Sequence, residues 1–197
     1  MSKESKIYIF KDKADYIKEI TKDNIFNVTG EKGSGKSFFG NLKDSDDNCV
    51  VIHLDPVFEP LGSKEHDYSK EIRDLLIDRY GEVLKSNIEF EEKYYNIIIE
   101  YLKKKKKTGY IEGGSISEIQ NVSNLVGTVI VKRTGIFKCF FRTVKRDYNN
   151  EYFMKQEIKL HGKFAKITRL YKVIKRRKKI FKSYHSIEQF IDRLEKC

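Results

Sequence analysis

The chain has 197 residues, enough for one domain with a full hydrophobic core, and its hydrophobic content of 39% is low but adequate. No apolar run approaches the roughly 18–20 residues needed to span a bilayer, and the polar first six residues do not predict a secretory signal. The three cysteines are widely spaced and predict neither a metal site nor a disulfide set, so we expect a cytoplasmic protein with reduced thiols.

The net charge of +11 is unevenly divided along the chain. Residues 1–100 carry 15 basic and 21 acidic side chains, whereas residues 101–197 carry 25 basic and 8 acidic ones. This asymmetry predicts that the second half meets an anion, which is either nucleic acid or the polyphosphate of a nucleotide.

Extended and helical patterns alternate along the chain. After a short extended run at 7–10 and a helical pattern through Tyr16, Ile17 and Ile20, strands are predicted at 24–29, 49–54, 109–114, 125–131 and 180–184. Helical patterns occupy 36–42, most of 67–107, 115–124, 136–174 with breaks, and 187–196 after a capping Ser186. This order predicts an α/β fold of three layers, with about five mostly parallel strands and helices on both faces.

One segment matches a motif with a known physical mechanism. Residues 30–37 read GEKGSGKS and fit the phosphate-binding pattern G-x-x-x-x-G-K-[ST] at every required position, between a predicted strand and a predicted helix. Its glycines allow backbone N–H groups to approach phosphate oxygens, and the following helix directs its dipole at the same anion. The alternative is a glycine-rich turn beside a solvated lysine.

The motif assigns roles to individual residues. Lys36 is expected to reach the β- and γ-phosphates of a nucleoside triphosphate, and the Ser37 hydroxyl to bind Mg²⁺. The expected nucleotide contacts are Gly30, Gly33, Ser34, Gly35, Lys36, Ser37 and Phe38.

Two carboxylates follow predicted strands. Asp55 comes after the strand at 49–54, at the sheet edge where ligands of open α/β sheets bind, and it could accept a proton from an attacking hydroxyl or hold Mg²⁺. Glu112 ends the next strand and could orient metal-bound water or contact the substrate. Alternatively, Asp55 could serve only to form the turn before Pro56, and Glu112 could be only a charged residue at the end of a strand.

Two arginines and a basic run lie in the second half of the chain. Arg142 and Arg146 are four residues apart, so one helical face presents both, and they could neutralise charge on transferring phosphates. Their alternative role is a solvated basic face. The run 175–179 is a candidate anion-binding segment whose aromatic neighbours Tyr171, Phe181 and Tyr184 could stack on bases or pack in the core.

Together these segments resemble the P-loop kinases of small molecules, in particular the uridine kinase and nucleoside or nucleotide kinase group. Beside 30–37, the segments HLDPVF at 53–58, YIEG at 110–113 and FRTVKRD at 141–147 carry the resemblance, which covers roughly 24–150. It implies ATP and Mg²⁺ as cofactors, a small hydroxyl- or phosphate-bearing acceptor, and catalytic roles for Lys36, Asp55, Glu112, Arg142 and Arg146.

The resemblance also implies how one domain is divided. The core would comprise 24–135 and 180–197, an acceptor-side helical region 59–108, and a lid with a basic helical region 136–179. Three alternatives stay open, namely an ATPase or nucleotide-binding module that acts with nucleic acid, a non-catalytic ATP-sensing protein and, as a variant of the kinase, a toxin-like kinase that acts on a nucleotide sugar.

Overall fold

A parallel β-sheet organises the molecule. The computed structural model describes residues 7–10, 24–59, 66–83 and 87–196, so the helical pattern expected around 16–20 lies outside the described residues. The strands lie side by side in the order β1 (Ile7–Phe10), β5 (Thr128–Lys132), β2 (Ile25–Gly30), β4 (Thr108–Glu112) and β3 (Cys49–His53), and every pair is parallel. The carboxyl ends of all these strands therefore meet at one edge of the sheet.

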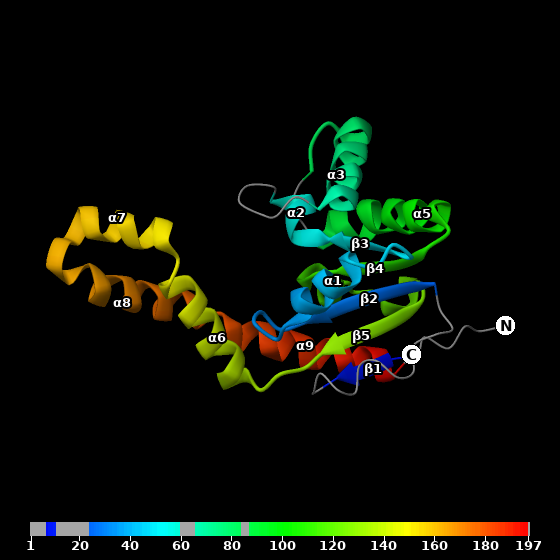
Figure 1. Ribbon diagram of the computed structural model, residues 1–197. Coiled ribbons are helices and arrows are strands. Elements are labelled where there is room, and N and C mark those ends of the chain that lie inside the picture. The colour runs from blue at the N-terminus through cyan, green and yellow to red at the C-terminus, as the bar shows by residue number, and fades with distance from the viewer. Residues whose placement is uncertain (1–6, 11–23, 60–65, 84–86, 197) are drawn as a thin grey trace.

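One face of the sheet is covered by α1 (Lys36–Asp44), which follows the central strand β2 directly (Figure 1). Between them lies a small apolar cluster. It contains Phe39 from the helix and alternate strand residues, namely Phe26, Val28, Cys49, Val51, Tyr110 and Ile130. The strand residues are apolar on both faces, as burial on both sides requires.

The opposite face carries the larger core. Its helices are α3 (Asp67–Tyr80), α5 (Tyr95–Lys105) and α9 (Ile180–Glu195), and they pack on strand side chains such as Ile52, Ile111 and Val129. Shorter elements link these layers: α2 (Leu54–Phe58), α4 (Asn87–Glu89), a π-helical turn (Phe90–Tyr94) and 3₁₀ turns at Gly114–Glu118 and Val122–Asn124. The described chain is thus an α/β structure with helices on both faces of a parallel sheet.

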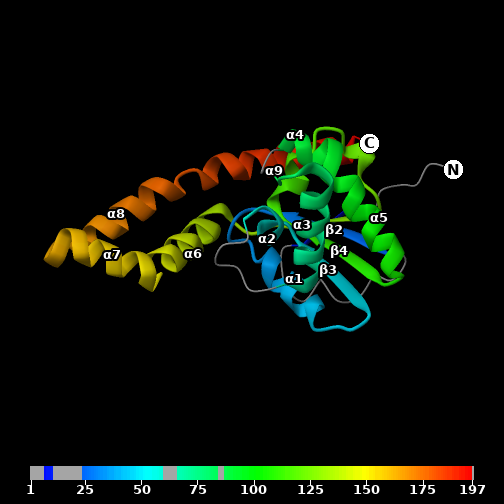
Figure 2. The same cartoon turned by 90° about the horizontal axis from the view of Figure 1, so that it is seen from above.

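Three helices project from this body as an arm, visible in two perpendicular views (Figures 1 and 2). They are α6 (Ile136–Tyr148), α7 (Glu151–His161) and α8 (Ala165–Arg177), with a 3₁₀ turn at Gly162–Phe164 between the last two. We call residues 136–179 the helical arm. It coincides with the range predicted as the lid, and it carries 15 basic and 3 acidic residues.

The predicted fifth strand at 180–184 is wrong, because these residues begin α9. Ser186 therefore does not cap a helix but lies inside one, where its Oγ donates a hydrogen bond to the Lys182 carbonyl at 3.2 Å. One face of α9 carries the buried residues Ile180, Ile187, Ile191 and Leu194. This helical spacing continues along the whole segment and outweighs the strand-like composition of 180–184. The predicted helix at 115–124 is also wrong, since it divides into two 3₁₀ turns.

None of the described helices combines the length and the apolar composition that a membrane span requires.

Candidate functional site

The glycine-rich loop at 30–37 connects the central strand β2 to α1. Gly33 and Gly35 have φ angles of +87° and +99°, in the left-handed region that favours glycine, and the Ser34 amide donates to the Glu31 carbonyl at 3.0 Å. Lys36 is the first residue of α1, so the backbone of the loop lies at the N-terminus of this helix, which is the positive end of the helix dipole. This arrangement suits an anion in front of the loop.

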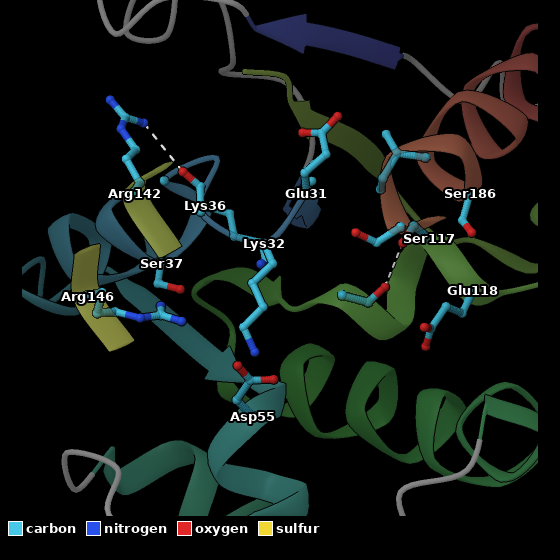
Figure 3. Close-up of a pocket in the computed structure, with 16 residues that line it drawn as sticks. Glu31, Lys32, Lys36, Ser37, Asp55, Ser117, Glu118, Arg142, Arg146 and Ser186 are labelled. Atoms are coloured by element: carbon cyan, nitrogen blue, oxygen red, sulfur yellow. Dashed lines mark hydrogen bonds between the residues drawn. The ribbon is translucent and has the colours of Figure 1, made fainter. Parts of the chain in front are cut away.

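A cavity of about 420 Å³ opens in front of this loop (Figure 3), within the ordinary size range of small-molecule sites. The structure brings most of the predicted site residues to its wall: Gly30, Gly33, Gly35, Lys36, Ser37, Asp55, Arg142 and Arg146. Residues that the sequence analysis did not assign to the site complete the wall: Glu31, Lys32, Gly114, Ser117, Glu118, Ser183, Ser186 and Ile187. The cavity is therefore lined almost entirely by charged, hydroxyl-bearing and glycine residues.

Two predicted nucleotide contacts do not line the cavity. Ser34 is buried beneath the loop, where its carbonyl accepts a hydrogen bond from the Thr134 hydroxyl at 3.0 Å. Phe38 is half exposed on α1. The motif fixes the position of these residues in the chain, but which of them face the cavity depends on how the loop and the helix turn.

Asp55 faces the loop from the neighbouring part of the sheet edge. It lies in the first turn of α2, immediately after β3, and the side chain of Lys32 points toward its carboxylate (Figure 3). Burial lowers the pKa of Lys32, and the charges of Arg177 and Arg146 lower it further, while the charge of Asp55 opposes the shift. Lys32 is thus a second loop lysine at the cavity, at a motif position where any residue type is allowed.

Glu112 lies behind the loop rather than in the cavity wall. Its side chain is buried, with 6% of its surface exposed, and its Oε1 accepts a hydrogen bond from the Ser37 hydroxyl at 3.3 Å. Ser37 and Asp55 offer a hydroxyl and a carboxylate oxygen to the same cavity, and such oxygens are ligands that Mg²⁺ prefers. These residues therefore fit the expected Mg²⁺, with Glu112 orienting Ser37 from behind.

The helix α6 closes the cavity on the side of the arm. Arg142 Nη1 donates to the Gly33 carbonyl at 3.4 Å, and Arg146 lines the same wall. A Cβ at position 33 would lie 2.8 Å from the Cys139 carbonyl oxygen, so glycine at this position allows α6 to approach the loop. The two arginines thus face the loop from one helix, as their spacing predicts.

Glu31 places a buried carboxyl in the loop itself. The residue is 1% exposed, and burial raises the pKa of its carboxyl, which backbone amides and the charge of Arg133 offset only in part. Nothing in the motif distinguishes this position, because the pattern allows any residue type there.

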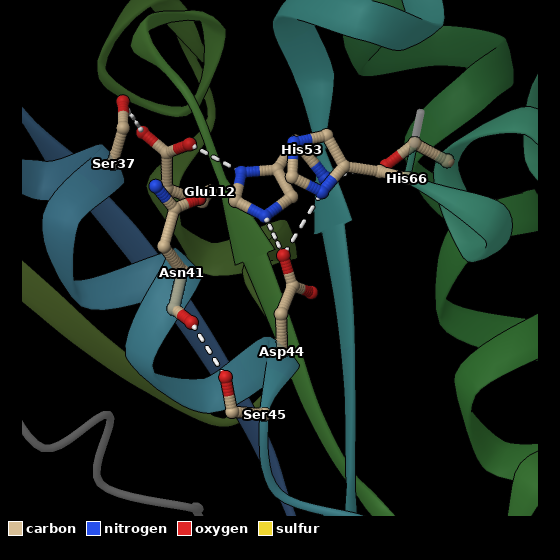
Figure 4. A network of polar contacts seen from close by, with 8 residues as sticks. Ser37, Asn41, Asp44, Ser45, His53, His66 and Glu112 are labelled. Carbon is tan, nitrogen blue, oxygen red and sulfur yellow. Dashed lines mark hydrogen bonds and ion pairs between the residues drawn. The ribbon is translucent and has the colours of Figure 1, made fainter. Parts of the chain in front are cut away.

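A polar network extends from Glu112 away from the cavity (Figure 4). Glu112 Oε2 lies 2.9 Å from His53 Nδ1, and His53 Nε2 lies 2.9 Å from Asp44 Oδ2, which also lies 2.9 Å from His66 Nδ1. Burial alone would lower the pKa of His53, but the hydrogen bonds and charges of Glu112 and Asp44 raise it. Burial and the neighbouring His53 lower the pKa of His66.

The sequence analysis singled out Glu112 alone of this network, because the other members come from separate elements that meet only in the folded chain. The chain matches no protein-family model, and no curated protein is significantly similar to it in sequence.

Proposed function

We propose that this chain is a Mg²⁺-dependent phosphotransferase that moves the γ-phosphoryl group of ATP or another nucleoside triphosphate to a small acceptor. One observation carries the proposal: the glycine-rich loop, Asp55 and the arginine pair of α6 converge on one cavity of about 420 Å³. A triphosphate needs the loop and the positive charges, and an acceptor hydroxyl needs a carboxylate.

The residues that would surround the triphosphate of ATP have a proposed electrostatic role. Lys36 approaches from the start of α1, and Arg142 and Arg146 approach from α6, so positive charge surrounds the position in front of the loop. Fixed charges of this kind stabilise the charge that develops on a transferring phosphoryl group. Mg²⁺ held by the Ser37 hydroxyl would supply further charge neutralisation of the phosphate oxygens.

On the acceptor side, we assign Asp55 to accept the proton of the attacking hydroxyl. Its carboxylate lies across the cavity from the loop, and Lys32 points toward it (Figure 3). The rest of this side is polar, with Ser117, Glu118 and Ser186 in the wall and Ile187 as the single large apolar side chain among the described lining residues. Such a wall favours a hydroxyl-rich acceptor over one that must bury an aromatic base.

The proposal is tested by measuring Mg²⁺-dependent ATP consumption against a panel of nucleosides, nucleotides, sugars and other polyhydroxylated compounds. The expected result is little turnover with ATP alone and strong stimulation by one class of acceptor. Equal ATP consumption with and without every acceptor would contradict phosphotransfer.

The helical arm favours a second candidate, a nucleotide-dependent protein that acts on nucleic acid. Its basic side chains outnumber its acidic ones by 15 to 3, and Tyr152, Phe164 and Tyr171 are exposed on it. Basic surfaces bind phosphate backbones, and exposed aromatic rings stack on unpaired bases. This candidate predicts ATP turnover stimulated by RNA or single-stranded DNA, with an affinity that falls steeply as salt rises.

A further inference from the structure

Three side chains from separate elements converge beside β3, outside the cavity. Asp44 is the last residue of α1, His53 is the last residue of β3, and His66 immediately precedes α3. One potential ligand atom from each lies within 4.8 Å of the other two. The exposed fractions of the side chains are 27%, 4% and 15%, so the cluster is largely enclosed but reachable from solvent.

The two imidazole rings are directed at one oxygen. His53 Nε2 and His66 Nδ1 both lie 2.9 Å from Asp44 Oδ2, and the ring centroids are 4.0 Å apart (Figure 4). Two imidazole nitrogens and a carboxylate oxygen are therefore gathered at a single point before any ligand arrives.

The orientation of His53 is fixed from two directions. A Cβ at Gly40 would lie 2.5 Å from His53 Cε1, so the ring rests directly against the backbone of α1. Its other nitrogen, Nδ1, lies 2.9 Å from Glu112 Oε2. A carboxylate that accepts the Nδ1 hydrogen leaves Nε2 free to act as a ligand, which is the outer-shell arrangement of many histidine metal ligands.

We propose that Asp44 Oδ2, His53 Nε2 and His66 Nδ1 bind a divalent transition-metal ion of the zinc class, with Glu112 as the outer-shell carboxylate. Two imidazoles and one carboxylate form a donor set that Zn²⁺ uses, whereas Mg²⁺ and Ca²⁺ prefer oxygen ligands. Ligand distances of about 2.0–2.1 Å in a tetrahedral site separate ligand atoms by about 3.3 Å, so the 2.9 Å contacts need to open by about 0.4 Å. Three protein ligands leave a fourth position for water.

One residue, Glu112, connects the proposed metal site to Ser37 at the end of the glycine-rich loop. Glu112 accepts from Ser37 with one oxygen and from His53 with the other. A bound metal would hold His53 in the Nδ1–H form and so keep Glu112 beneath Ser37. Metal binding at the cluster does not require a nucleotide, however, and it is measured without one.

The test uses the full chain, freed of metal with a chelator, and follows binding of Co²⁺ by its visible absorption and of Zn²⁺ by competition with a chromophoric chelator. One equivalent is expected, with the intense bands of low-coordinate Co²⁺ and without a thiolate charge-transfer band. His66→Ala and Asp44→Ala should each weaken Zn²⁺ binding at least tenfold, and Glu112→Gln should weaken it roughly ten- to a hundredfold.

His185→Ala is the matched control, because His185 is exposed on α9 and contacts Gln189 instead. It should leave Zn²⁺ affinity unchanged. His66→Gln provides a second variant at the same position, and thermal unfolding without metal checks that each variant is folded. Zn²⁺ affinity unchanged in folded His66 and Asp44 variants, a thiolate band that shows binding at cysteine, or no binding by the wild-type chain would each overturn the proposal.

Discussion

The Ser37 hydroxyl donates a hydrogen bond to Glu112 Oε1 at 3.3 Å, although 75 residues separate them in the sequence. Ser37 belongs to the first turn of α1 and faces the cavity, whereas Glu112 ends β4 and is buried behind it. This contact joins the loop at 30–37 to the network of His53 and Asp44. The proposed phosphate site and the proposed metal site thus share one carboxylate.

Lys36→Ala should weaken ATP binding roughly ten- to a hundredfold, because a charge-assisted hydrogen bond to phosphate contributes about 1.5–3 kcal/mol. Titration with a fluorescent ATP analogue in the presence of Mg²⁺ measures the effect. Lys43→Ala is the control, since Lys43 lies in the last turn of the same helix, over the Tyr110 ring. A comparable loss in both variants would show that the affinity comes from general charge and not from the loop.

Asp55→Asn should reduce phosphoryl transfer by about 10²–10⁴-fold while ATP binding persists, because the amide cannot accept the acceptor's proton. Steady-state turnover and ATP titration of the same preparation separate the two effects. Asp67→Asn serves for comparison, since Asp67 also lies in the first turn of a helix but does not line the cavity. Full activity of the Asp55 variant would exclude the proton-accepting role.

Arg142→Ala should lower kcat by about 10²–10³-fold and change ATP affinity little, because the guanidinium acts mainly on charge that develops during transfer. Lys145→Ala removes a positive charge of α6 that does not line the cavity and should leave kcat near the wild-type value. If both substitutions lower kcat equally, the effect comes from the overall charge of the helical arm.

Glu31 should make stability depend on pH. Burial raises the pKa of its carboxyl, so between the ordinary and the raised pKa the folded chain holds a proton that the unfolded chain releases. The free energy of unfolding is then highest below the ordinary pKa of glutamate, about 4.3, and falls as pH rises through the raised pKa. Urea unfolding at several pH values should show this fall in the wild type and a smaller fall in Glu31→Gln.

Glu100→Gln controls for the loss of a negative charge, since Glu100 is exposed on α5. It should keep the pH dependence of the wild type. Identical pH profiles for the wild type and Glu31→Gln would mean that Glu31 is not the source of the dependence.

The sequence predicted those parts of the molecule that depend on local pattern. The glycine spacing of 30–37 identified the loop, and the rule that parallel strands share a carboxyl edge brought Asp55 near it. The four-residue spacing of Arg142 and Arg146 likewise placed both on one helical face at the cavity.

Other features depend on contacts between distant segments, and the sequence pattern did not predict them. The strand expected at 180–184 is the start of α9, where Phe181 contacts Phe137 and Phe140 of α6 and the later residues of the same helix pack in the core beside the sheet. Asp44 and His66 meet at His53 only after α1, β3 and α3 have packed together. A cluster of this kind leaves no spacing rule in the sequence.

The most direct measurement follows the γ-phosphoryl group of labelled ATP in the presence of Mg²⁺ and the acceptor class that stimulates turnover. The account predicts that the label appears on the acceptor, that Asp55→Asn forms labelled product at least a hundredfold more slowly than the wild type, and that Lys36→Ala forms less of it at low ATP concentration. Label released only as inorganic phosphate, or transfer at the wild-type rate in both variants at low ATP concentration, would contradict it.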